Sequence, residues 1–147
     1  MAQQASKPRA APSRNPPAVC GLYAGPRRSA ALLIDPVAQR QLSVSLANTE
    51  QAYGALLAWL AERCAQLVIP DTLLAAPFLN QASYTPVVVW IAPSALLEAI
   101  RLAAGLTTRA PKQTAALLAR WPTVAALRPF LRRLSASSPP TDQLSLL

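Results

Sequence analysis

The sequence predicts an α/β domain, and three patterns in the centre of the chain carry that prediction. Residues 49–63 place apolar side chains at helical spacing, namely Tyr53, Leu56, Leu57 and Leu60. The period-two pattern of residues 42–46 precedes this helix, and short apolar runs at 67–69 and 87–91 follow it. Helices that alternate with strands in a compact unit imply parallel strands joined by right-handed crossovers.

The segment before the helix predicts two further strands. Residues 18–24 form the first, and the turn Gly25-Pro26-Arg27-Arg28 leads into the second at residues 29–34. Residues 42–46 alternate apolar and polar side chains, as expected of a half-exposed edge strand. Short turns join the three strands, so we expect an antiparallel meander.

Two helices flank the strand at residues 67–69. Asn48 is expected to cap the helix at residues 49–63. The second helix, at residues 72–80, is short, because Pro77 should kink or end it.

Three helices are expected after the strand at residues 87–91. Ser94 should cap the first, and Gly105 should stop it. The second begins near Pro111 and ends at Pro122, and the last is a basic helix at residues 124–134.

The resulting order of elements is β β β α β α β α α α. A three-strand antiparallel meander followed by βαβ units and C-terminal helices is the plan of the ribonuclease H-like fold, which we therefore predict for residues 18–134. Rearranged meanders in other α/β folds are the alternative. Residues 1–17 carry a few basic side chains among Pro, Ala, Gln and Ser, so a disordered basic arm is expected. Residues 135–147 are rich in Ser and Pro and are expected to form a disordered tail.

Charge in this chain of 147 residues is scarce and strongly basic. Fourteen Lys and Arg against six Asp and Glu give a formal net charge of +8. This excess suggests an anionic partner, most often nucleic acid, although a GC-rich genome that uses Arg and Ala freely would also produce it. The expected phosphate contacts are the arginines of the last helix, Arg128, Arg132 and Arg133. A solvated helix face is the simpler explanation for any one of them.

Several kinds of site are excluded by composition. The chain has no histidine, and its two cysteines, Cys20 and Cys64, lie far apart. A zinc site needs about four N or S ligands, and Ser-His or Cys-His catalysis lacks its base. We expect two buried cysteines in a reducing cytoplasm. No stretch approaches the ~18 apolar residues of a membrane span, and the first residues lack an apolar signal core, so a cytoplasmic protein with no membrane partner is expected.

Segments of the predicted domain resemble those of a known family. Residues 48–60 read NTEQAYGALLAWL, residues 87–93 read VVVWIAP, residues 115–120 read AALLAR, and Arg128-Pro129 follows. In order and spacing they resemble "NTxxGxxALLAWL", "VxVVNP", the end of "KTDxxDAxxLAR" and "RP" in the N-terminal RuvC-like domain of DEDD insertion-sequence transposases (the IS one-ten family). Ala52 replaces the first Gly of the family pattern. The resemblance covers residues 19 to about 129 and implies a ribonuclease H-like fold.

The resemblance also implies acidic residues that hold two divalent metal ions and cut DNA. Tyr23, Pro111 and Thr114 stand at three of these positions, and Asp71 lies at or one residue from the fourth. One carboxylate at most remains, and Lys112 adds a positive charge that disfavours a bound cation. We therefore expect no catalytic residue, metal or cofactor. A nuclease that uses Asp71 with unrecognised partners is a weaker alternative.

The tail contains the most specific short motif of the chain. Gln143-Leu144-Ser145-Leu146-Leu147 resembles the peptide that binds the bacterial sliding clamp, of the form Gln-Leu-Ser/Asp-Leu-Phe/Leu. By this resemblance Gln143 forms hydrogen bonds at one subsite, while the three leucines fill an apolar groove and residues 135–142 serve as a tether. A chance apolar sequence in a low-complexity tail is an equally weighted alternative.

These observations predict a non-catalytic accessory protein of DNA transactions, in replication, repair or mobile-element biology, that docks on the sliding clamp. The alternatives are a truncated or decayed transposase, or a partner-binding module unrelated to DNA. An accessory protein must fold alone and keep the tail motif, whereas a decayed fragment need do neither.

Overall fold

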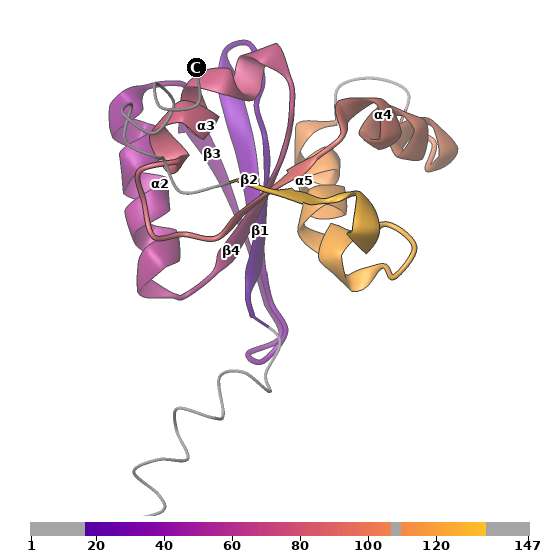
Figure 1. Cartoon of the computed structure of the whole chain (residues 1–147), viewed down its shortest axis with the longest axis horizontal. Coiled ribbons are helices and arrows are strands. Elements are labelled where there is room, and N and C mark those ends of the chain that lie inside the picture. The colour runs from indigo at the N-terminus through magenta and orange to yellow at the C-terminus, as the bar shows by residue number, and fades with distance from the viewer. Residues whose placement is uncertain (1–16, 107–109, 135–147) are drawn as a thin grey trace, which may run out of the picture.

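A six-stranded mixed sheet forms the centre of the molecule, in a computed structural model that describes residues 17–106 and 110–134 (Figure 1). The strand order is β3-β2-β1-β4-β5-β6. The strands are β1 (Val19–Tyr23), β2 (Arg28–Asp35), β3 (Arg40–Ala47), β4 (Gln66–Pro70), β5 (Val89–Ala92) and β6 (Arg132–Arg133). The predicted α/β class is confirmed.

Helices cover both faces of this sheet. In the described part of the chain they are α2 (Glu50–Glu62), α3 (Ala76–Ala82), α4 (Ser94–Ala103) and α5 (Pro111–Arg120). Short 3-10 turns lie at η1 (Leu73–Ala75), η2 (Trp121–Thr123) and η3 (Arg128–Phe130). Figure 1 shows α2 and α3 on one side of the sheet and α4 and α5 on the other. None of the helices described is long and apolar enough to cross a membrane.

The strand pairing changes from antiparallel to parallel at β1. Strand β2 pairs antiparallel with both β1 and β3, whereas β4 pairs parallel with β1 and β5. Helix α2 therefore connects β3 to a strand that is not its neighbour, because β2 and β1 lie between β3 and β4. β1 and β4 run in the same direction, so their carboxyl ends meet at one edge of the sheet.

The core has two sides because successive strand residues point to opposite faces. Cys20 and Leu22 of β1 pack in the cluster that contains Phe78 of α3. Val19 of the same strand packs with Leu118 of α5. Successive residues of β4 also pack on opposite sides of the sheet. The two central strands are therefore buried on both faces and contain almost only apolar residues.

Helix α5 lies directly on β1, and a glycine permits this approach. A Cβ added to Gly21 would meet the carbonyl oxygen of Ala115 and would lie 2.5 Å from the amide nitrogen of Ala119. Both atoms belong to the backbone of α5, so a side chain at this position would force the helix off the strand.

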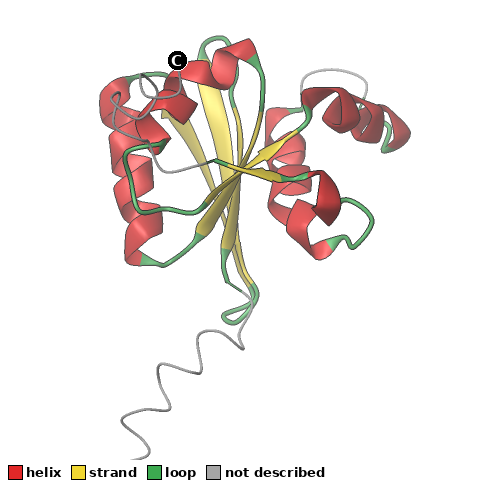
Figure 2. Cartoon of the chain, in the orientation of Figure 1, coloured by secondary structure: helices red, strands yellow, loops and turns green. Residues whose placement is uncertain are grey.

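The predicted basic helix at residues 124–134 is wrong. This segment contains turns, the 3-10 turn η3 and the short strand β6, which pairs antiparallel with β5 (Figure 2). Pro129 cannot donate a backbone hydrogen bond and interrupts helical pairing. The backbone N–H of Leu134 instead donates to the carbonyl of Val89 at 2.9 Å, so this segment satisfies the free edge of β5.

Two predictions at helix starts also fail. Thr49, not Asn48, caps α2, and its hydroxyl accepts the N–H of Ala52. Asn48 instead accepts a hydrogen bond from the Ser29 hydroxyl at 2.6 Å and donates one to the carbonyl of Gly25 at 2.7 Å. Pro77 lies in the first turn of α3 and neither kinks nor ends it. Backbone N–H groups in the first turn have no partner within the helix, so the N–H that proline lacks is not missed there.

The predicted stop at Gly105 is confirmed. Gly105 has φ 81°, and the N–H of Leu106 donates to the carbonyl of Arg101 at 2.9 Å. This left-handed glycine and the returning hydrogen bond close the carboxyl end of α4.

Candidate functional site

The edge at which β1 and β4 end is the place where the family resemblance implies metal-binding acids. Tyr23 ends β1, and Asp71 follows β4 directly. Pro111 begins α5 and lines the same cleft as Tyr23, with a volume of about 610 Å³. The structure thus brings at least two of the four predicted positions together, and neither of these two residues carries a carboxylate.

Asp71 is held by a structural contact. Its Oδ1 accepts the backbone N–H of Ser94 at 2.9 Å, and its own N–H donates to the carbonyl of Ala92 at 3.1 Å. The carboxylate therefore caps the amino end of α4, where a negative charge is favourable. The predicted capping by Ser94 is wrong: Pro93 occupies the cap position and offers no side-chain acceptor.

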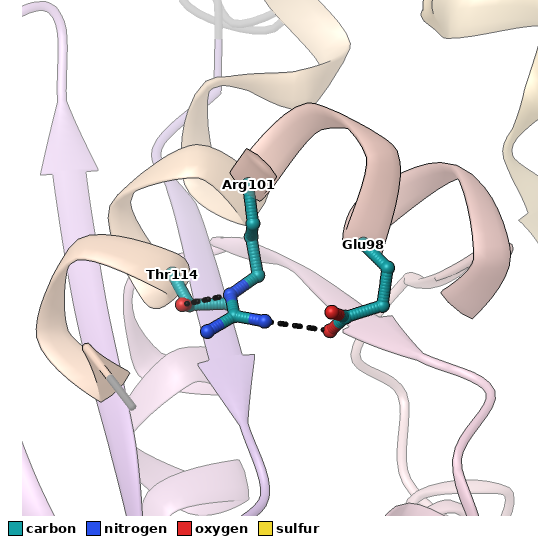
Figure 3. A network of polar contacts seen from close by, with 3 residues as sticks. All are labelled: Glu98, Arg101 and Thr114. Carbon is teal, nitrogen blue, oxygen red and sulfur yellow. Dashed lines mark hydrogen bonds and ion pairs between the residues drawn. The ribbon is translucent and has the colours of Figure 1, made fainter. Parts of the chain in front are cut away.

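The side chain of Thr114 accepts a hydrogen bond from a buried arginine (Figure 3). The Nε of Arg101 in α4 donates to Oγ1 of Thr114 in α5 at 3.1 Å. A terminal nitrogen of the same guanidinium pairs with Oε2 of Glu98 at 2.7 Å. Arg101 is only 7% exposed and Thr114 is fully buried, so this contact lies inside the packing of α4 against α5.

The Arg101 guanidinium changes the chemistry at this position. An arginine is always protonated and donates hydrogen bonds but accepts none. It therefore places a positive charge beside the residue that would have to bind a metal cation. In the described part of the chain, no three His, Cys, Asp or Glu residues are grouped so that they could hold a metal ion.

The arginines predicted to contact phosphates do not share one helix face. Arg128 lies in η3, where its Nε donates to the carbonyl of Pro122 at 3.0 Å. Arg132 and Arg133 are successive residues of β6 and so point to opposite sides of the sheet. All three are exposed, and their contact with DNA stays a prediction.

The structure groups Arg128 with residues that the sequence did not single out. Arg120 at the end of α5 and Gln66 at the start of β4 line the same cleft as Arg128, at the opposite end of β1 from Tyr23. These residues come from separate segments, and no spacing pattern in the sequence connects them.

The two cysteines differ, which corrects the expectation that both are buried. Cys20 is buried in β1, and desolvation raises the pKa of its thiol to about 12, although a backbone hydrogen bond opposes this shift. Cys64 is exposed and has φ 53°, in the tight turn that follows α2. The exposed thiol is therefore the reactive one.

The predicted clamp-binding residues Gln143, Leu144, Ser145, Leu146 and Leu147 lie outside the described residues. The sequence was also compared with family models and with curated proteins. No family model matches it, and no curated protein matches it.

Proposed function

We propose that the chain is a non-catalytic accessory protein of DNA transactions, with a ribonuclease H-like scaffold and a tail that docks on the bacterial sliding clamp. One observation carries the non-catalytic part. The positions that hold metal-binding acids in the resembled transposases carry Tyr23, Pro111, a helix-capping Asp71 and a Thr114 bonded to a buried arginine.

The order of strands supports the scaffold. Strands β1, β2 and β3 follow one another in the chain and pair antiparallel, while β4 and β5 are parallel to β1 on its other side. This is the arrangement expected of an antiparallel meander followed by βαβ units. Pro111 and Thr114 belong to α5, the helix that packs closely on β1.

Activation of water for phosphodiester cleavage at such a site depends on metal ions and their carboxylate ligands. Asp71 and Glu98 are engaged by the amino end of α4 and by Arg101, respectively. The chain at this edge can therefore hold its helices in place but offers no set of acids for catalysis. We therefore expect the chain to act by binding its partners.

The partners are suggested by charge and by the tail. A net charge of +8 favours sequence-independent contact with phosphates, which weakens as salt rises. The exposed Arg132 and Arg133 lie on β6, close in sequence to the tail with the clamp motif. A clamp-docked protein would hold these arginines close to the DNA that the clamp encircles.

The DNA part of the proposal is tested with the purified full chain and a fluorescent duplex. We expect binding that weakens with salt and no cleavage of supercoiled plasmid in Mg²⁺ or Mn²⁺. Replacing Arg132 and Arg133 by alanine should reduce the slope of log affinity against log salt by about 1 to 2, since each phosphate contact contributes about 0.9 and the two side chains point to opposite sides of the sheet. The matched control replaces Arg27 and Arg40, which are also exposed, and should change the slope less.

Metal-dependent cleavage that copurifies with the full chain and disappears in Asp71→Asn would contradict the non-catalytic assignment. Absence of DNA binding would favour the module unrelated to DNA. The decayed transposase is favoured if the chain neither binds DNA nor folds cooperatively, because a fragment under no selection need do neither.

A further inference from the structure

A second cleft lies at the opposite end of β1 from Tyr23, and we call it the amino-end cleft. Its volume is about 610 Å³, and residues from the starts of β1 and β4 and from the ends of β2 and α5 line it. Val19, Ile34, Pro36 and Pro122 give it apolar walls. This volume lies in the range of small-molecule sites, which combine apolar walls with a few polar groups.

The polar groups of the amino-end cleft mostly offer donors. Oε1 of Gln66 already accepts the indole N–H of Trp90 at 3.0 Å, which leaves the amide NH₂ for a ligand. The Nε of Arg128 donates to the carbonyl of Pro122, and this bond orients the guanidinium while its terminal nitrogens remain for a ligand. Arg120 is a second arginine in the lining, so a ligand rich in acceptors fits this cleft.

No carboxylate among the described residues lines the amino-end cleft. Asp35 stands between Ile34 and Pro36 in sequence, but it lines a different cleft, together with Arg40 and Arg63. There its Oδ1 accepts the backbone N–H groups of Val37 and Ala38 at 3.1 and 3.2 Å. The charge of the two arginines is therefore not neutralised by a neighbour inside the cleft.

We propose that the amino-end cleft binds a small organic anion, namely a carboxylate attached to an apolar body. The planar guanidinium matches a carboxylate with paired hydrogen bonds, and such charge-assisted bonds are stronger than neutral ones. The proline and β-branched side chains take up the apolar body. The cleft involves neither the tail motif nor the arginines of β6, and it shares only Arg128 with the predicted phosphate contacts.

The test is an NMR titration of the ¹⁵N-labelled full chain with three probes. They are 3-phenylpropanoate, its neutral amide 3-phenylpropanamide, and inorganic phosphate. We expect saturable shifts with the carboxylate at the amides of Val19 and Ile34 and at the indole N–H of Trp90, which is bonded to Gln66. The indole of Trp59, on α2 at the other face, should not shift. The amide and phosphate should each bind at least about tenfold more weakly, since each lacks one half of the ligand.

Two variants with the same change in charge localise the effect. Arg120→Gln removes a guanidinium that lines the amino-end cleft and should weaken the carboxylate several-fold. Arg27→Gln, at the opposite end of β1 from this cleft, should leave the affinity unchanged. The proposal would be overturned if the amide or phosphate bound as tightly as the carboxylate. It would also be overturned if the shifts were confined to other residues, or if both variants weakened the binding equally.

Discussion

Asp71 and Arg101 show how the packing of a helix can engage charged side chains. Both are charged and both lie near the edge where β1 and β4 end, yet each is committed to holding α4. Asp71 accepts the first backbone N–H of that helix, and Arg101 connects it to Thr114 of α5. A carboxylate that already caps a helix loses part of its favourable contact if it turns to bind a metal.

The thiols give a prediction that depends on pH. The pKa of Cys20 rises from 9.0 to about 12 on folding because burial disfavours the thiolate. The folded state therefore holds this proton more tightly, so its stabilisation is complete below about pH 9 and is lost as pH rises toward 12. Between these values the free energy of unfolding should fall by about 1.4 kcal/mol per pH unit from this group alone.

Urea denaturation at pH 7.5 and pH 10 measures this effect, with Cys20→Ala as the reference. The wild type should lose more stability than the variant over this interval, while Tyr53, whose pKa burial also raises, contributes to both proteins alike. A thiol reagent at pH 8 should label Cys64 quickly and Cys20 only after unfolding. Equal labelling rates for the two thiols, or identical pH dependence in both proteins, would contradict the account.

Some features of single residues could be predicted from the sequence, and others could not. Tyr23 and Pro111, which spacing from the resembled motifs singled out, line one cleft. The spacing did not reveal the partner of Asp71, because Ser94 lies 23 residues later and the contact depends on the packing of α4. The burial of Arg101 was equally hidden, since charged residues on a helix are usually exposed.

At the level of elements, the packing of α5 on β1 depends on the absence of a side chain at Gly21. We expect Gly21→Ala to destabilise the fold by about 3 kcal/mol or more, since the new Cβ meets backbone that cannot rotate away. Gly54→Ala is the matched control. Its Cβ would lie 3.1 Å from the flexible end of Gln81, and alanine inside α2 should stabilise by roughly 0.5–1 kcal/mol.

Chemical denaturation of the two glycine variants decides this point. If Gly21→Ala unfolds at the same urea concentration as the wild type, α5 does not lie against β1 as described. A soluble but unfolded Gly21→Ala, judged by circular dichroism beside a folded Gly54→Ala, would agree with the account.

The elements differ in how far the sequence predicts them. Helix α2 and strand β4 have strong periodicity or dense apolar runs, and both are found at nearly the predicted residues. Strand β6 was mistaken for a helix because residues 124–134 carry apolar and basic side chains at mixed spacing. What forms β6 is the unpaired edge of β5, a long-range partner that no local pattern contains.

For the whole molecule, the sheet separates two ends with different chemistry. The edge with Tyr23, Asp71 and Pro111 carries one carboxylate, that of Asp71, and it caps α4. The opposite end holds the amino-end cleft with Arg120 and Arg128. The α/β class and most of the strands were predictable from local patterns, whereas the grouping of side chains at either end required the folded sheet.

The central claim, docking on the sliding clamp, is tested most directly by calorimetry with a purified bacterial clamp. We expect the full chain to bind, and removal of residues 143–147 to weaken binding by well over tenfold, or about 1.4 kcal/mol or more, because the leucines that fill the groove are lost. Ser145→Asp is the control, since the motif accepts either residue, and it should bind as the wild type does. Failure of the full chain to bind, or equal binding by the shortened chain, would contradict the account.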